Sequence, residues 1–515
     1  MLALLLALLG ASLPPDSSPL LERLGRAQRL LEAQDHPAAR RELSEALRLH
    51  PESPVVRNFL GVLEAQEGNY VAAEARFREA LARGPHYTDA ALNLGRLYQE
   101  NTATDKEAIR KAVAVYEELL GYAPDHAEAR YQSAVVLHAQ GEFGRSLTHL
   151  DLLPPADQER PAALALRCGN EAGRGERPKA DEAAERLLGR LDLTEDDLRP
   201  ILPDLLTHGR EDLALRFLER LQAQGLASTD AQRQLGLLYE GQKQFDRARQ
   251  VLEQAAEGRT PSVQLLVDLA RVAHKERDYR GALGYLAHAR SLEPGNAGVH
   301  FFFGMVCVDL DLGVEAFDSL KEAVRLEPEN AHFNYALGAV ALHRRDPGEA
   351  IPFFKKYAAL RPEDAQGPLA LGIAAFQAHD FPLARGELRK ASERKETAAA
   401  AHYFLARIAR EENDLDEALR LAQKAVEADA RYADPYAELG ILYIRKRETD
   451  RAEQSLRRCL ELDPDNYLGN YHLLMLYQRT KDGREEAQAR RFEELKQRRE
   501  EKSDEFRRVI EVRPY

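Results

Sequence analysis

The residues best able to carry out chemistry are spread along the chain in no arrangement that would bring them together. The sequence contains no G-x-x-x-x-G-K-[ST] phosphate loop, no H-E-x-x-H zinc motif and no G-x-S-x-G nucleophile motif. Ser392 and Lys395 form an S-x-x-K pair, but no K-T-G sequence accompanies it, and we interpret the pair as coincidental. The sequence therefore predicts no catalytic residue.

Histidine and cysteine, the common ligands of transition metals, are equally dispersed. None of the 15 histidines stands four residues from another, the spacing that lets two imidazoles on one helix reach one metal. The three cysteines, Cys168, Cys307 and Cys459, are far apart and form no C-x-x-C motif. We expect neither a metal site nor a disulfide framework, and no cofactor.

The charge balance argues against nucleic acid as a partner. The chain carries 72 lysines and arginines against 85 aspartates and glutamates, a net charge of -13. As a whole it would repel a phosphate backbone. Tryptophan is absent and aromatic residues are scarce, whereas Ala, Leu, Glu and Arg recur as they do in long helices. The elements that position any functional residue are thus predicted to be helices.

A period of 34 residues organises most of these helices. One ladder of alanines has this spacing: Ala248, Ala282, Ala316, Ala350, Ala384, Ala418 and Ala452. A second ladder is always small: Gly236, Ala270, Gly304, Gly338, Gly372, Ala406 and Gly440. A third consists of helix-stopping prolines: Pro51, Pro85, Pro294, Pro328, Pro362 and Pro464. Each unit therefore reads as two antiparallel helices that approach closely where the small residues lie.

The order of large, small, Ala, large, Ala and Pro positions closely resembles the tetratricopeptide repeat family, over most of the chain. In the unit 297–330, Phe303 and Gly304 fall on the first helix and Ala316 and Ala323 on the second. The resemblance implies an all-α fold, a right-handed α-solenoid superhelix of antiparallel helix pairs. It also implies a function in binding proteins or peptides rather than in catalysis. In this setting Cys307 and Cys459 are expected to be small buried side chains.

Five segments follow from the register of the repeat. They are a leader and short linker at 1–19, an N-terminal repeat block at 20–126, degenerate helical repeats at 127–228, a C-terminal repeat block at 229–466, and a terminal repeat with a charged capping helix at 467–515. The N-terminal block carries about five extra residues near 101–106. Prolines interrupt the pattern in 127–228, which we interpret either as a joint between the blocks or as a continuous superhelix with irregular turns.

The first residues, MLALLLALLGASLPP, have the form of a secretory leader. An apolar run from Leu2 to Leu9 precedes small residues and two prolines, and it is too short to span a bilayer. The leader predicts a periplasmic or secreted protein that begins near Leu13 and has no integral membrane segment in its mature form. The alternatives are an apolar helix docked on the first repeat and a cytoplasmic adaptor.

Family resemblance also indicates where a ligand would lie. The first helix of each pair lines a concave groove, with groove side chains at the second, fifth, sixth, ninth, twelfth and thirteenth positions of the unit. In the units from 297 to 432 this register gives an apolar candidate groove: Phe301, Phe302, Met305, Tyr335, Leu342, Leu369, Ile373, Phe376, Tyr403 and Phe404. The alternative is that these side chains pack against the next repeat, as apolar stripes at helical spacing commonly do.

A carboxylate-binding clamp, which some members of the family possess, is not predicted. Asn58, Asn93 and Arg96 match it only in part, because no lysine occupies the remaining clamp positions. The leading hypothesis is an exported, non-enzymatic scaffold that holds partner proteins or peptides, for example in secretion, pilus or outer-membrane assembly. The rival is a regulatory or substrate-recruiting subunit of an enzyme complex. The sequence does not indicate an oligomeric state.

Overall fold

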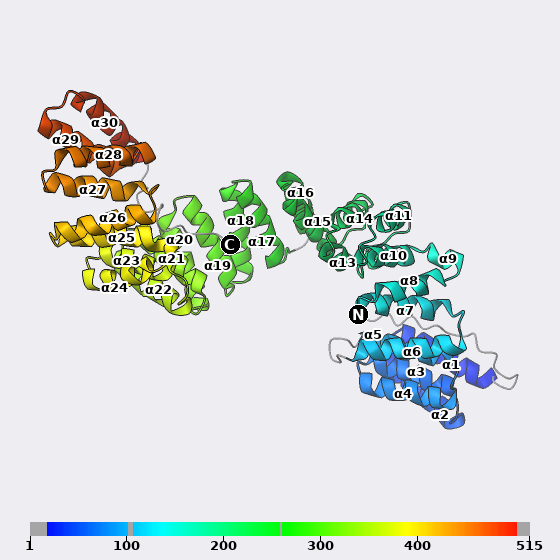
Figure 1. The fold of residues 1–515 in the computed structure, drawn as a ribbon. Coiled ribbons are helices and arrows are strands. Elements are labelled where there is room, and N and C mark those ends of the chain that lie inside the picture. Colours follow the sequence, from blue (N-terminus) through cyan, green and yellow to red (C-terminus); the bar gives the residue numbers. More distant parts are fainter. Residues whose placement is uncertain (1–17, 101–106, 258–259, 502–515) are drawn as a thin grey trace. The chain divides into compact units, whose positions relative to one another are not determined.

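A computed structural model describes residues 18–100, 107–257 and 260–501, which form thirty helices and no strand. Its contacts divide the chain into two units, 1–244 and 245–515, and each is built of antiparallel helix pairs (Figure 1). The predicted all-α solenoid of helix pairs is therefore confirmed. The leader lies outside the described residues. No helix in the described ranges is both long enough and apolar enough to cross a membrane.

The first unit contains α1 to α15. Their bounds are α1 Ser18–Glu32, α2 His36–Leu49, α3 Pro54–Gln66, α4 Tyr70–Arg83, α5 Thr88–Glu100, α6 Ala108–Tyr122, α7 Ala127–Ala139, α8 Phe143–Asp151, α9 Pro155–Gln158, α10 Pro161–Gly173, α11 Arg177–Leu188, α12 Glu195–Leu198, α13 Leu202–Thr207, α14 Glu211–Ala223 and α15 Thr229–Gly241.

The second unit contains α16 to α30. Their bounds are α16 Phe245–Ala256, α17 Val263–Lys275, α18 Tyr279–Leu292, α19 Ala297–Asp309, α20 Gly313–Leu326, α21 Ala331–His343, α22 Pro347–Leu360, α23 Gln366–Gln377, α24 Phe381–Ser392, α25 Lys395–Glu411, α26 Leu415–Ala428, α27 Ala433–Arg445, α28 Thr449–Leu462, α29 Tyr467–Thr480 and α30 Glu485–Glu501.

A left-handed residue marks the turn between the two helices in most of the described pairs. Positive φ angles recur every 34 residues at Gly141, Gly175, Gly209, Lys243, Arg277, Asp311, Arg345, His379, Asn413, Arg447 and Lys481. The next residue often caps the second helix; Asp278, for example, accepts a hydrogen bond of 2.9 Å from the Gly281 amide. Because three of the left-handed residues fall within 127–228, the register of the repeat continues through that segment.

Prolines alter the helices of 127–228 without shifting this register. The first helix of one pair is divided into α12 and α13, with Pro200 between them, since proline lacks the N–H that a continuous helix needs. Buried His138 on α7 connects the helices of this segment by polar contacts. Its Nδ1 lies 2.9 Å from Asn170 Oδ1 on α10, and its Nε2 lies 3.0 Å from Asp204 Oδ2 on α13. Whether this segment acts as a joint stays a prediction.

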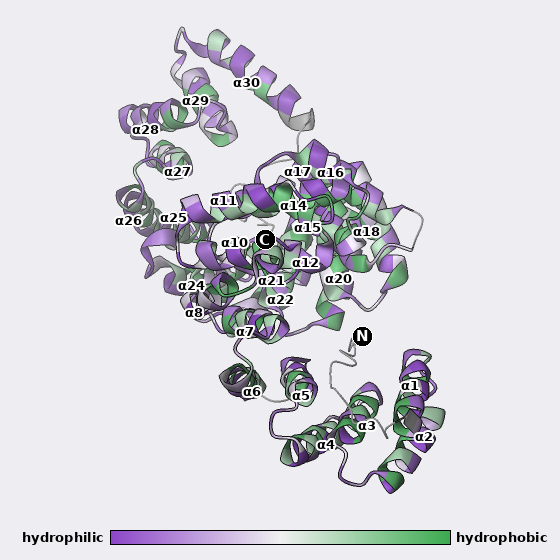
Figure 2. Ribbon diagram, turned by 90° about the vertical axis from the view of Figure 1, so that its right-hand side faces the viewer, coloured by the Kyte–Doolittle hydropathy of each residue, from purple (hydrophilic) through white to green (hydrophobic). Residues whose placement is uncertain are grey.

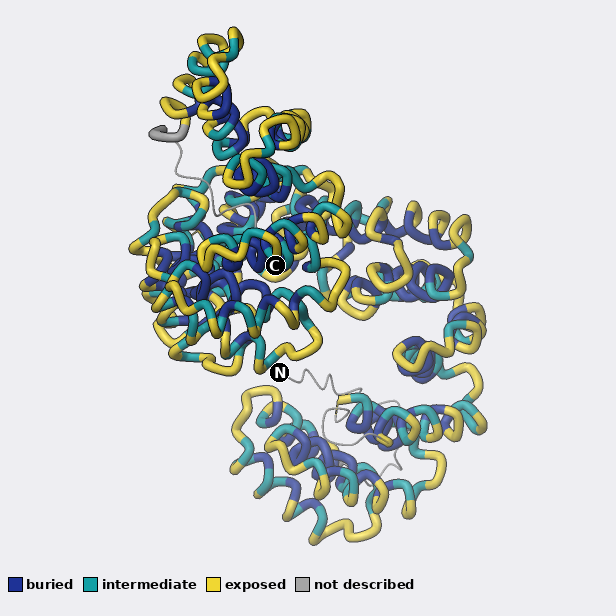
Figure 3. Tube along the Cα trace, turned by 60° about the vertical axis from the view of Figure 1, so that its left-hand side comes forward, coloured by how far each residue is buried: buried dark blue, intermediate teal, exposed yellow. Residues whose placement is uncertain are grey.

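In several pairs, the small residue of the first helix meets a large side chain of the second. A Cβ atom built on Gly440 would lie 2.5 Å from Leu456, and one on Gly95 would lie 2.3 Å from the Tyr116 ring. Every alanine of the predicted ladder is fully buried, and so are Cys307 and Cys459. Figure 3 shows buried residues along one side of the helices and exposed residues along the other. The small-residue ladders therefore set how closely the helices of a pair approach.

We expect Gly440→Ala to destabilise the second unit by about 1–3 kcal/mol, because the added methyl group enters space that Leu456 already fills. The matched control is Gly386→Ala on α24, where an added Cβ meets nothing within 4 Å and should stabilise the helix by up to about 1 kcal/mol. Urea unfolding followed by circular dichroism measures both changes. Equal stability of the two variants would contradict this account of the ladder.

Candidate peptide-binding face of the second unit

The ten predicted groove residues lie on the first helices α19, α21, α23 and α25, and most of them are covered. Eight are at most 9% exposed: Phe301, Met305, Leu342, Leu369, Ile373, Phe376, Tyr403 and Phe404. Phe302 and Tyr335 are partly buried. The apolar stripe thus belongs largely to the core between repeats, as the alternative interpretation expected. A role for it in binding a peptide stays a prediction.

Ring contacts explain this burial. Phe301 stacks on Phe333 of the next first helix, with ring centroids 4.7 Å apart. Phe376 meets Phe404 of the next first helix edge-on at 5.6 Å, whereas Tyr335 packs at 4.9 Å against Tyr357 on the second helix of its own pair. Neighbouring units approach so closely that side chains at these positions fill the space between them.

Arg407 on α25 ends the apolar stretch. Its guanidinium lies 4.8 Å from the ring centroid of Phe376 and 5.5 Å from those of Tyr403 and Phe404. A cation placed over aromatic faces is attracted by the ring quadrupole, so this arginine closes the stack with a charged group. From α25 onward arginines also occupy inner positions of the first helices: Arg407, Arg410, Arg445 and Arg479.

An arginine cluster surrounds one buried carboxylate on α27. The Arg410 guanidinium forms an ion pair with Glu438, which is 1% exposed, and a second one with Glu411 at 3.2 Å. Arg445 donates to the carbonyl oxygen of Arg410 at 3.3 Å. Burial raises the pKa of Glu438, while the nearby guanidinium groups of Arg410, Arg407 and Arg445 act to lower it.

Next to this cluster, α29 exposes apolar side chains on the same stripe as an arginine. Tyr471 is 38% and Met475 44% exposed, and Arg479 follows four residues later. Because α27 and α29 are in contact and Arg445 and Arg479 hold the same position in successive units, these two guanidinium groups share one face. Within the described ranges neither has a carboxylate partner. We name Arg410, Arg445, Tyr471, Met475 and Arg479 the α29 patch.

The pKa of His472 is lowered in part by the positive charges of this region. Burial, followed by the charges of Arg410 and Arg445, lowers the pKa of its imidazole from 6.5 to about 4. The ring is therefore neutral at pH 7, and a third positive charge beside the two guanidinium groups is avoided.

Sequence reasoning placed the groove in the units from 297 to 432 and missed the α29 patch. The signal was present, because Arg410 holds the twelfth position of its unit, Arg445 the thirteenth, and Tyr471 and Met475 the fifth and ninth of the terminal unit. The polar residues of the first unit bind one another instead: Asn93 donates to Asn58 at 3.0 Å, and Arg96 pairs with Glu128 at 2.6 Å.

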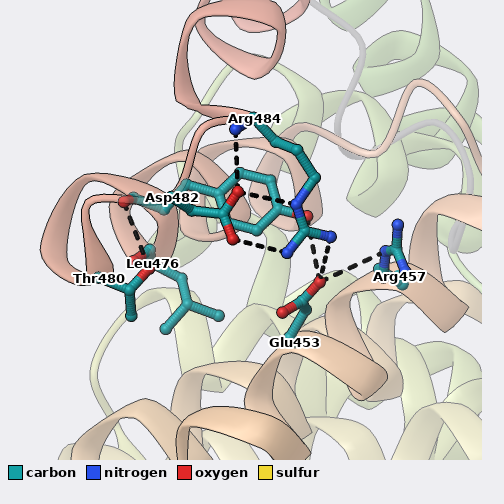
Figure 4. Close-up of polar contacts among 7 residues, drawn as sticks. Glu453, Arg457, Leu476, Thr480, Asp482 and Arg484 are labelled. Carbon is teal, nitrogen blue, oxygen red and sulfur yellow. Dashed lines mark hydrogen bonds and ion pairs between the residues drawn. The ribbon is translucent and has the colours of Figure 1, made fainter.

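The terminal helix α30 is fixed by a separate ionic contact. Arg484, just before α30, donates to Glu453 on α28 at 2.6 Å and to Asp482 at 2.7 Å (Figure 4). Arg457 lies 3.6 Å from the same Glu453 carboxylate. Figure 2 shows that α30 is mainly hydrophilic, in keeping with the predicted charged cap. The groove beneath it, lined by Leu460, Leu473 and Tyr477, is thus flanked by paired charges.

The described residues contain no group of three or more histidine, cysteine, aspartate or glutamate side chains that could hold a metal. Burial raises the pKa of the Cys168 and Cys459 thiols to about 12 and that of Cys307 to about 11. At neutral pH these thiols are protonated, which suits packing better than nucleophilic chemistry.

Comparison with known families gives matches described as Tetratricopeptide repeat along both units. They cover residues 24–88, 103–167, 231–257, 314–365, 369–433 and 409–479. Together the matches span more than half of the chain. Among curated proteins, no sequence matches this one.

Several solved structures resemble the chain at low identity. The Cut9–Hcn1 hetero-tetramer of the APC/C matches with 13% identity over 89% of this chain and 97% of that one, at a TM-score of 0.37. Yeast Tom70 matches with 16% identity over 86% and 91%, also at 0.37. A tetratricopeptide repeat protein from Parabacteroides merdae matches with 16% identity over 56% and 98%, at 0.34.

His472 should make the second unit sensitive to acid. Its folded pKa is about 4 and its unfolded pKa is 6.5, so the unfolded chain takes up a proton first as the pH falls. The free energy of unfolding should therefore decrease from about pH 6.5 down to about pH 4 and then level off. At roughly 1.4 kcal/mol per pKa unit, we expect a loss of about 2 kcal/mol, which is less than the full shift because the ring is partly solvated.

The measurement is urea unfolding at neutral and acidic pH for the wild type and for His472→Gln. The variant lacks the titrating imidazole and should lose less stability on acidification than the wild type. Equal losses in the two proteins would show that His472 does not carry this pH dependence.

Proposed function

Because the chain belongs to the tetratricopeptide repeat family, we propose that it is a non-enzymatic scaffold that binds partner proteins or peptides. The α29 patch is the observation that carries this proposal. Apolar side chains at the inner positions of α19 to α25 are mostly buried, whereas Tyr471 and Met475 at equivalent positions of α29 are exposed. Exposed apolar side chains rimmed by charges are typical of protein-binding surfaces.

The arrangement of the helices supports a non-enzymatic role for the described residues. Helix pairs in one register account for nearly all described residues, which leaves no block of about 100 residues for an independent catalytic fold. A role as the recruiting subunit of an enzyme complex is compatible with the same surface. In that case the catalytic residues would belong to the partner.

We further propose that the protein is exported and works in a cell envelope, in secretion, pilus or outer-membrane assembly. The support is the apolar run from Leu2 to Leu9, followed by small residues and prolines. The net charge of -13 supports protein rather than nucleic-acid partners.

Crosslinking followed by affinity capture from the native organism tests the scaffold. We expect the wild type to capture a defined set of proteins and Met475→Asp to lose it, because a charge would replace the apolar contact. The control Val314→Ser removes an apolar side chain that is even more exposed, 59% against 44% for Met475, from α20, a second helix, and should keep the set. A partner set unchanged in Met475→Asp would exclude the inner face of α29, and an absence of specific partners would refute the scaffold.

Fractionation of the native organism together with N-terminal sequencing tests export. We expect a mature chain that begins near Leu13 and is recovered from the periplasm or the medium. A chain that retains Met1 and fractionates with the cytoplasm would support the adaptor interpretation instead.

A further inference from the structure

The α29 patch combines exposed apolar side chains with exposed guanidinium groups. Tyr471, Met475 and Arg479 stand four residues apart along one stripe of α29, beside Arg445 on α27. We propose that this patch selects a partner segment that carries carboxylate side chains next to apolar ones. This inference rests on the proposed function and names the chemistry of the ligand.

Positive charge exceeds negative charge at the patch. Three guanidinium groups, those of Arg410, Arg445 and Arg479, meet only two carboxylates, Glu411 and Glu438. Both carboxylates are bound by Arg410, so the other two guanidinium groups keep donors for a ligand. Arginine favours carboxylates because its planar fork matches their two oxygens.

The charge of the whole chain strengthens this selection. The chain as a whole carries a net charge of -13 and repels an acidic segment at long range. The guanidinium groups of the patch attract such a segment locally. Attraction at one place and repulsion at others together produce specificity.

The apolar side chains specify the second half of the ligand. Tyr471 is held by ring contacts with Phe492 of α30 at 5.5 Å and with His472 at 5.0 Å, so its exposed part is a fixed surface. Met475 beside it has a flexible side chain that adapts to different apolar partners. A ligand with apolar groups one helical turn from its carboxylates would cover both halves of the patch.

The test is fluorescence anisotropy with the full chain and a short fluorescein-labelled peptide of alternating glutamate and leucine. A peptide with glutamine in place of glutamate is the matched probe. We expect the acidic peptide to bind, and added salt to weaken its binding. Arg445→Gln and Arg479→Gln should each weaken it by roughly tenfold, since a charged hydrogen bond is lost.

Arg431→Gln serves as the control, because Arg431 is exposed in the turn before α27, at the opposite end of that helix from Arg445. Its affinity should equal that of the wild type, and circular dichroism should be unchanged in all three variants. Because the arginines concerned lie at the surface, loss of binding with an intact fold assigns the effect to the patch.

Equal affinity for the glutamate and glutamine peptides, or wild-type affinity in both patch variants, would overturn the inference. So would displacement of the acidic peptide by a single-stranded oligonucleotide, or self-association of the chain that Arg445→Gln abolishes. None of these results would affect the scaffold itself, provided that Met475→Asp still loses its crosslinked partners. The two proposals therefore fail separately.

Discussion

The close approach of two helices within each pair is the constraint on which the rest of the structure depends. It requires a small residue on the first helix opposite a large one on the second, as Gly338 faces Phe354 and Gly440 faces Leu456. In the pair α25–α26 both of these positions hold a small residue, Ala406 on the first helix and Ala422 on the second, and both are buried. This contact fixes which face of each first helix points inward. Every functional interpretation of the inner face follows from it.

Close packing between successive units decides whether an inner side chain is core or surface. From α19 to α25, large apolar side chains at the inner positions pack against the next first helix and are buried, as Phe301 is against Phe333. On α29 the side chains at the same positions, Tyr471 and Met475, are exposed, and Tyr471 packs on one side against Phe492 of α30. The same position in the repeat is thus part of the core in one unit and part of the surface in another.

The period, the small-residue ladders and the helix pairs could be predicted from the sequence, because each depends on contacts between residues at fixed spacing. The ladder of left-handed turn residues could also have been predicted, because Gly141, Gly175 and Gly209 have the period of 34. The prolines around these glycines obscure that period in the sequence. The burial of the predicted groove residues could not be predicted in the same way. It depends on how closely successive units pack, which the register of a single unit does not contain. Phe302 and Phe301 are adjacent in sequence, yet only Phe301 is fully covered.

Arg407 borders the apolar core of the inner face on α25. Its guanidinium covers the aromatic rings of Phe376, Tyr403 and Phe404, so the apolar core ends in a cation rather than in exposed rings. A cation that is partly buried favours nearby carboxylates, and Glu438 supplies one from α27. Arg410 then pairs with Glu438, and Arg445 binds the Arg410 backbone rather than another acid. Further along the inner face, Arg479 of α29 is exposed to solvent beside Tyr471 and Met475. A ligand that carries carboxylates next to apolar groups complements both kinds of side chain.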